Sequence, residues 1–294
     1  MTNIINKASA MIYSRLTDLC LDSILPSRAS SASILGGRYT NLLRVWLSDP
    51  WKDYEAIMPT TDEGSILACR NGTYFLKVNI GVYEGKNTEL LLRALSKIQH
   101  PSISKIFDVY CYDSKVFVAS EYPELPLVDL DFHIFHFDEW EIATIIKEVL
   151  RGSEYLLRQG VSCKDISMSN IRLSINGDIK IALNFNQYVY QRKEKNLNLL
   201  HAFLDLPILA EIAEDMMLPR YHMVGAINNG WSLEAFQFLS HCISGTVESM
   251  LKVITAYEMS KHPFLQQAKS PSKLAPRVRF AMEVLRLKAI IINE

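Results

Sequence analysis

The sequence has little cysteine, and none of it forms the close pairs that metal centres and redox motifs use. Its five cysteines lie at positions 20, 69, 111, 163 and 242, and no CxxC pair occurs. An odd number of widely spaced cysteines does not fit the disulfide framework of a small secreted domain. We therefore expect a reducing compartment, with the protein cytoplasmic or nuclear.

The sequence also lacks a charge excess and a long apolar run. Its net charge is −1, which argues against a nucleic-acid partner, because such proteins usually carry a basic surface. No apolar run approaches the roughly 20 residues that span a bilayer, and the N-terminus has no clear signal-peptide pattern. Hydrophobic residues make up 49% of the 294 positions, enough for one two-lobed domain or two small ones.

Apolar spacing and turn residues predict the elements of the chain. Residues 4–21 have helical periodicity, the Ser-rich residues 27–33 follow as a connector, and a second short helix is expected over 38–47. The Asn71-Gly72 pair between alternating segments predicts a hairpin within 53–80. The other expected elements are helices at 87–99, 138–158 and 275–292, and strands at 105–112 and 115–120.

The most informative stretch is residues 161–185, VSCKDISMSNIRLSINGDIKIALNF. Its turn at 174–178 lies between two apolar runs, IRLSI and IKIAL, which predicts a short hairpin. The stretch resembles the catalytic loop and hairpin of eukaryotic protein kinases. The family's H-R-D-L-x-x-x-N stands here as Cys163-Lys164-Asp165-Ile166-Ser167-Met168-Ser169-Asn170. The resemblance implies an α+β, bilobal fold, with a small antiparallel-sheet N-lobe plus helix and a mainly helical C-lobe.

The resemblance also implies roles for single residues of this stretch. Asp165 takes the position of the catalytic base, and Asn170 that of a magnesium ligand. The family's metal-binding D-F-G falls on Leu183-Asn184-Phe185, and leucine cannot ligate a hard cation, which takes oxygen ligands. A one-residue bulge would bring Asn184 to the metal position instead, as a neutral and weaker ligand.

The predicted strand hairpin carries the nucleotide-site positions of the N-lobe. Gly64 with Ile66 matches the tail of the family's Gly-rich loop, and Lys77 matches its phosphate-binding lysine. The two earlier loop glycines are replaced by Pro59 and Thr61. Glycine lets backbone N–H groups approach phosphates, and proline has no N–H to offer.

Residues 121–124, EYPE, match the hinge between the lobes, with Ser120 as the gatekeeper. Pro123 cannot donate the backbone hydrogen bond that the family gives to adenine at that position. Phe75 replaces the alanine that lines the adenine pocket, where a phenyl ring would crowd a purine. The candidate nucleotide-site residues are thus Gly64, Ile66, Lys77, Ser120, Glu121 and Pro123. ATP is expected to bind weakly or not at all, with Asn170 as the candidate magnesium ligand.

Other landmarks of the family follow in order. The helix at 87–99 ends in His100-Pro101-Ser102-Ile103, similar to the H-P-N-I after the kinase αC helix. Leu91 stands where αC carries its lysine-pairing glutamate, and Glu89 is the nearest acid. Five C-lobe landmarks match: the end of αE at 155–160, the αF aspartate at Asp205, αH at 232–243, αI at 247–259, and a closing H-P-F-L at 262–265. No A-P-E occurs, and its arginine partner, which should fall near Val253, is absent.

Residues 133–138 contain His133, His136 and Asp138, a spacing that resembles part of a zinc site. Four-ligand zinc sites usually need a second ligand pair, which is not evident in this chain. We expect no zinc here and interpret the segment as the linker into the helix at 138–158.

The resemblance covers about residues 55–268. It implies an N-terminal helical extension at 1–54, an N-lobe at 55–122, a C-lobe at 123–268 and a C-terminal helix at 269–294. It also implies a pseudokinase that binds an unidentified protein partner, because the framework is kept while the metal position is apolar. Two alternatives remain: an atypical active Ser/Thr kinase that uses Asp165 and Asn170, and a purely structural subunit without nucleotide.

Overall fold

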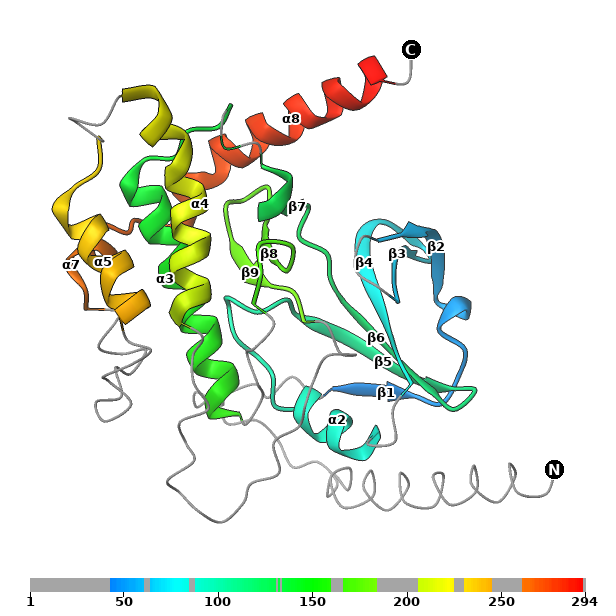
Figure 1. Cartoon of the computed structure of the whole chain (residues 1–294). Coiled ribbons are helices and arrows are strands. Elements are labelled where there is room, and N and C mark those ends of the chain that lie inside the picture. Colours follow the sequence, from blue (N-terminus) through cyan, green and yellow to red (C-terminus); the bar gives the residue numbers. More distant parts are fainter. Residues whose placement is uncertain are drawn as a thin grey trace, which may run out of the picture. The chain divides into compact units, whose positions relative to one another are not determined.

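The structure is a computed structural model, and it describes residues 43–60, 64–84, 88–130, 132, 134–159, 166–183, 206–224, 230–244 and 261–292. The chain divides after Leu42, and all of these residues belong to the second unit, Leu43–Glu294. This unit has the α+β, bilobal fold that the resemblance implies, with a six-stranded sheet in one lobe and most of the helices in the other (Figure 1).

The sheet of the N-lobe has the strand order β1-β5-β6-β4-β3-β2. The strand bounds are β1 Arg44–Trp46, β2 Tyr54–Pro59, β3 Ser65–Arg70, β4 Thr73–Tyr83, β5 Ile106–Tyr112 and β6 Lys115–Glu121. Neighbouring strands are antiparallel except β1 and β5, which are parallel, so the sheet is mixed. The short helix η1, Pro50–Lys52, precedes β2, and α2, Thr88–Leu95, follows β4.

Alternation of apolar and polar residues fixes the two faces of this sheet. In β4, Val78 and Ile80 are fully buried, whereas Lys77 is exposed. The buried pair packs with Tyr54 and Tyr110 in the core of the lobe. The predicted Asn-Gly hairpin is confirmed: Gly72 has φ +76°, a conformation that glycine adopts readily.

The prediction of a helix over residues 38–47 is wrong where the structure describes it. Arg44–Trp46 forms the strand β1, which pairs with β5 in the register Val45 to Val109. The strand is held by a partner 62 residues away, because the Trp46 indole Nε1 donates to the Asp108 carboxylate at 3.1 Å. Residues 38–42 lie outside the described residues. The expected boundary at residue 54 stays a prediction, although β1 before it already joins the sheet.

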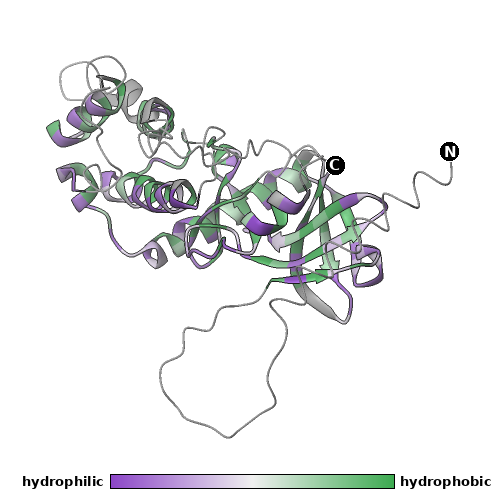
Figure 2. Ribbon diagram, turned by 90° about the horizontal axis from the view of Figure 1, so that it is seen from below, coloured by the Kyte–Doolittle hydropathy of each residue, from purple (hydrophilic) through white to green (hydrophobic). Residues whose placement is uncertain are grey.

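The C-lobe combines a small antiparallel sheet, β7-β8-β9, with helices. The element bounds are β7 Leu125–Pro126, η2 Leu127–Asp129, α3 Glu139–Arg158, β8 Ile171–Leu173, β9 Ile179–Ile181, α4 Leu206–Val224, α5 Leu233–Ser244, α7 Pro263–Gln266, η6 Pro271–Leu274 and α8 Ala275–Ile292. Hydrophilic and hydrophobic residues alternate along the helices (Figure 2). In α3 the apolar stripe, with Ile142, Ile146 and Val149 fully buried, forms the centre of the lobe.

Most of the expected elements are confirmed within one to four residues. The helices at 138–158, 232–243 and 275–292 are α3, α5 and α8, and the helix at 87–99 is the shorter α2. The helix expected at 247–259 and Asp205 lie outside the described residues. Among the described helices, none combines the length and the apolar content that crossing a bilayer would require.

Candidate functional site

The Gly-rich-loop positions lie at the turn between β2 and β3. Gly64 has φ +75°, and its carbonyl accepts a hydrogen bond from the backbone N of Val82 at 3.1 Å. Ile66 follows in β3 and pairs with Ile80 of β4. Residues 61–63 lie outside the described residues, so the structure places only the end of this loop.

Lys77 lies on β4 opposite Cys69, and its side chain is exposed. The nearest acid on α2 is engaged elsewhere, because the Glu89 carboxylate pairs with Arg93 one turn along the helix at 2.8 Å. Leu91, at the position of the family's glutamate, is buried. The helix α2 therefore presents the alkyl side chain of Leu91 at the position where the family has its lysine-pairing carboxylate.

The gatekeeper and hinge positions lie at the end of β6 and just after it. Ser120 is buried, and its hydroxyl donates to the Asn79 carbonyl at 3.3 Å. The backbone N of Glu121 donates to the carbonyl of Lys105 at 2.7 Å, and the Glu121 carboxylate accepts from the backbone N of Lys105 at 3.0 Å. Pro123 is buried and has no N–H to donate.

Asn170 and Leu183 are brought together on the C-lobe side. The side-chain oxygen of Asn170 accepts from the backbone N of Ser167 at 2.9 Å, within its own loop. The carbonyl of Asn170 accepts from the backbone N of Ala182 at 2.7 Å, which sets the next residue, Leu183, beside it. Leu183 is only 9% exposed. This position thus offers a buried alkyl group where a hard cation would need oxygen.

Several predicted site residues lie outside the described residues: Cys163, Lys164, Asp165, Asn184 and Phe185. The roles expected for them stay predictions. The same holds for the side chain of Phe75, whose backbone lies in β4. His133 is also outside the described part, and within that part no group of three His, Cys, Asp or Glu side chains could hold a metal ion.

A comparison with known proteins finds similarity over the region that contains this site. Residues 83–185 match the family model described as "Protein kinase domain". Over these residues the chain is protein kinase-like. It is 27% identical over 215 residues to the serine/threonine-protein kinase PAK mbt of Drosophila melanogaster, covering 62% of this chain and 34% of that protein.

Two yeast kinases are also similar to this kinase-like chain. It is 37% identical over 94 residues to the serine/threonine-protein kinase STE20 of Saccharomyces cerevisiae, covering 32% of this chain and 10% of that protein. It is 27% identical over 116 residues to the CTD kinase subunit alpha of Schizosaccharomyces pombe, covering 39% and 19%. The kinase-like chain thus matches about a third of the length of PAK mbt and less of the two yeast kinases.

Two cations of the hairpin β8–β9 were missed in the sequence, where IRLSI and IKIAL were interpreted as apolar runs. Arg172 of β8 lies with its guanidinium carbon 5.1 Å from the ring centroid of Tyr122. The Nζ of Lys180 on β9 lies 3.1 Å from the carboxylate of Glu121. The predicted hinge is therefore contacted by both cations. A charged residue in the centre of each of two short apolar strands was the available signal.

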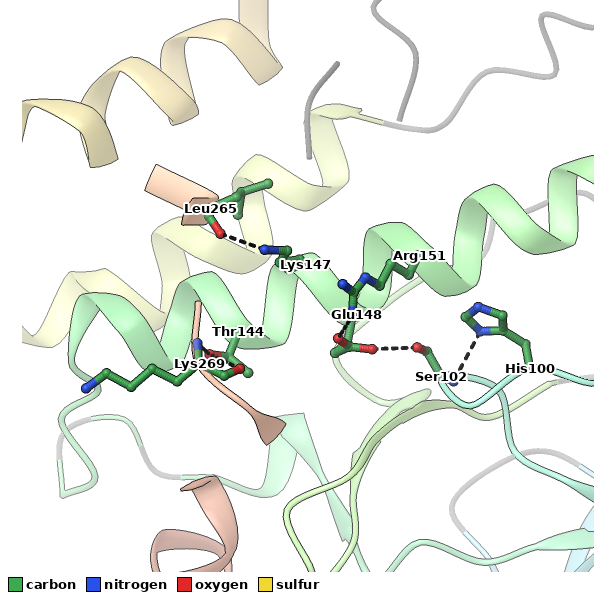
Figure 3. A network of polar contacts seen from close by, with 8 residues as sticks. All are labelled: His100, Ser102, Thr144, Lys147, Glu148, Arg151, Leu265 and Lys269. Atoms are coloured by element: carbon green, nitrogen blue, oxygen red, sulfur yellow. Dashed lines mark hydrogen bonds and ion pairs between the residues drawn. The ribbon is translucent and has the colours of Figure 1, made fainter. Parts of the chain in front are cut away.

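The loop between α2 and β5 also connects the two lobes of the kinase-like fold. The Ser102 hydroxyl donates to the Glu148 carboxylate of α3 at 2.8 Å, and the Ser102 backbone N donates to His100 Nδ1 at 3.2 Å (Figure 3). The His100 ring stacks on Tyr155 with 4.8 Å between centroids. The backbone N of Ile181 on β9 donates to the Ser102 carbonyl at 2.9 Å. The loop thus joins the N-lobe to both α3 and β9.

Acidification is expected to destabilise the kinase-like fold through His100. Burial lowers the pKa of His100 below its usual 6.5, and the Glu148 carboxylate offsets only part of this effect. The unfolded chain therefore takes up the proton at a higher pH than the folded one. The free energy of unfolding should be fully kept above about pH 6.5 and should fall as the pH drops below it.

Urea unfolding at a series of pH values between about 8 and 5 measures this effect. The control variant is His100→Gln, which should show a weaker loss on acidification. This variant should retain the part of the stability loss that is due to His262, because burial also lowers the pKa of His262. An equal loss in wild type and variant would assign the effect to other groups.

Proposed function

We propose that the chain is a pseudokinase, a catalytically impaired protein kinase-like domain that acts as a protein-interaction or regulatory module with weak or absent ATP binding. The observation that carries the proposal is Leu183, buried beside Asn170 at the position of the metal-binding carboxylate. A catalytic metal supplies several kcal/mol of charge stabilisation, and each ~1.4 kcal/mol is a factor of ten in rate. The expected loss of turnover is therefore several orders of magnitude.

Three further observations support the proposal. The Asn170 side chain serves its own loop, because its oxygen accepts the Ser167 backbone N–H. Glu89 pairs with Arg93, so it does not orient Lys77. Pro123 removes a hinge donor. These differences fall on separate parts of the site, and together they weaken metal, phosphate and base binding while the fold is kept.

Phosphotransfer is expected to be negligible. The measurement is incubation of the full chain with labelled ATP, magnesium and a generic Ser/Thr substrate, with Asp165→Ala as the matched control. The proposal requires that wild type transfers no more phosphate than the variant. Robust transfer that Asp165→Ala abolishes would overturn it.

The second candidate function is an atypical Ser/Thr kinase. It is favoured by the presence of Asp165, Asn170 and Lys77 at their family positions and by similarity to proteins named serine/threonine-protein kinases. It requires magnesium-dependent ATP binding, which calorimetric titration with and without magnesium would detect. A purely structural subunit would bind no nucleotide at all, so the same titration separates it from a pseudokinase that retains weak binding.

A further inference from the structure

The hairpin β8–β9 holds two positive charges in an electrostatically unfavourable arrangement. Arg172 and Lys180 are directly opposite each other in the antiparallel register. Like charges at such positions repel each other and destabilise the strand pair. The Arg172 residue is 3% exposed and the Lys180 side chain 14%, so water screens neither charge well. Each cation therefore needs a compensating group.

The hinge supplies one compensating group for each cation. The Tyr122 ring lies under the Arg172 guanidinium, at 5.1 Å from centroid to carbon, within the range of a cation–π interaction. The Glu121 carboxylate forms an ion pair with the Nζ of Lys180 at 3.1 Å. Glu121 is itself fixed, because it also accepts the Lys105 backbone N–H at 3.0 Å. Two successive hinge residues thus contact two opposed hairpin cations, Glu121 through an ion pair and Tyr122 through its ring.

The backbone extends the same contact along the hinge. Leu125 pairs with Leu173 and Pro126 with Arg172 in the antiparallel ladder of β7 and β8. Farther along the hairpin, the Glu124 carboxylate accepts the Ile175 backbone N–H at 3.2 Å. The segment 121–126 therefore lies against the hairpin over most of its length.

We propose that Glu121, Tyr122, Arg172 and Lys180 form a hinge latch that holds the two lobes together in place of a nucleotide. The latch predicts that a purine binding at the hinge, 121–123, competes with Arg172 for contact with the Tyr122 ring. Such a purine would thereby leave a buried cation without its ring. The latch rests on the proposed pseudokinase function in one respect: a domain that does not turn over ATP has no need to open this contact in each cycle.

The test is hydrogen exchange of the full chain, read for residues 121–126 and 171–181, in a double-mutant cycle. Tyr122→Leu in the wild-type background should speed exchange of these amides about tenfold, because the cation–π contact between Arg172 and the hinge is lost. The same change in an Arg172→Leu background should have little effect, because no cation remains over the Tyr122 ring. Equal acceleration in both backgrounds would overturn the latch.

The second arm keeps the test decisive if Tyr122→Leu fails to fold. Glu121→Gln is nearly isosteric, and it should speed exchange in wild type but much less in Lys180→Met. The matched control is Arg286→Leu, which removes an exposed cation of α8 that pairs with Glu283, and it should leave hinge exchange unchanged. Acceleration by this control equal to that of Glu121→Gln would contradict the proposal.

The outcome for the latch is separable from that for the proposed function. Millimolar ATP should leave hinge exchange in wild type unchanged, and protection of residues 121–126 by ATP would overturn the latch. Phosphotransfer by wild type would overturn the pseudokinase. The double-mutant cycle tests only the contact between hinge and hairpin. If the paired substitutions act additively on exchange and no phosphate is transferred, the latch is refuted and the proposed pseudokinase function is not.

Discussion

Replacing Asp108 with alanine is expected to lower the free energy of unfolding by about 3–5 kcal/mol, because two donors that bond its carboxylate lose their acceptor and a packed side chain is removed. Asp108 is fully buried in β5. Its carboxylate accepts hydrogen bonds from the Tyr54 hydroxyl at 2.9 Å and the Trp46 indole at 3.1 Å. It also pairs with the Arg44 guanidinium at 2.9 Å. Alanine leaves donors from β1 and β2 without their acceptor.

The three donors do not contribute equally to this loss. The Arg44 side chain is 52% exposed, so it can turn to water and its ion pair adds little. The Tyr54 hydroxyl is buried, and both burial and the Asp108 carboxylate raise the pKa of Tyr54. Its unmet hydrogen bond should therefore dominate the cost, at about 1–3 kcal/mol, with the lost packing and the Trp46 contact adding the rest.

Urea unfolding followed by tryptophan fluorescence measures the Asp108→Ala effect. The matched control is Glu55→Ala, which removes an exposed carboxylate from β2 and should change stability by less than about 0.5 kcal/mol. Asp108→Asn should fall between the two, because the amide oxygen can still accept from Tyr54. If Asp108→Ala cost no more than Glu55→Ala, the carboxylate would not be what holds β1 and β2 to β5.

Sequence patterns predicted those parts of the fold that depend on near neighbours. The Asn71-Gly72 hairpin, the long helix α3 and the hairpin β8–β9 were all predicted from local residues, because turn chemistry and periodicity act over a few positions. The strand β1 was missed, since it is held by pairing with β5 and by the contacts of Arg44 and Trp46 with Asp108, all far along the chain. A charged residue within an apolar strand gives no indication of which distant donor it meets.

The candidate site divides in the same way. Family positions such as Lys77, Asn170 and Leu183 could be assigned by counting from motifs. Their surroundings could not, because the Asn170 side chain folds onto Ser167 and Arg172 meets Tyr122 only through tertiary contacts. In both cases the residue type was visible and its partner was not. Arg172 and Lys180 show that a charged residue within an apolar run indicates a partner elsewhere in the fold.

Gly177→Ala is expected to destabilise the C-lobe by about 2–5 kcal/mol, the sum of a left-handed backbone cost and a steric clash. Gly177 closes the turn between β8 and β9 with φ +87°. A Cβ atom there would lie 2.3 Å from the Pro271 carbonyl oxygen and 2.8 Å from the Ala275 backbone N. Both are backbone atoms at the start of η6 and α8, so no side chain can rotate away.

The matched control separates backbone strain from the clash. Gly72 has a similar φ of +76°, but a Cβ atom there meets nothing within 4 Å. Gly72→Ala should therefore cost only the conformational term, about 1–2 kcal/mol. The difference between the two variants measures how firmly η6 and α8 pack on the hairpin, and limited proteolysis near residue 275 should be faster in Gly177→Ala alone. Equal destabilisation by both variants would mean that α8 yields easily, although Arg277 pairs with the buried Glu141 of α3 at 2.6 Å.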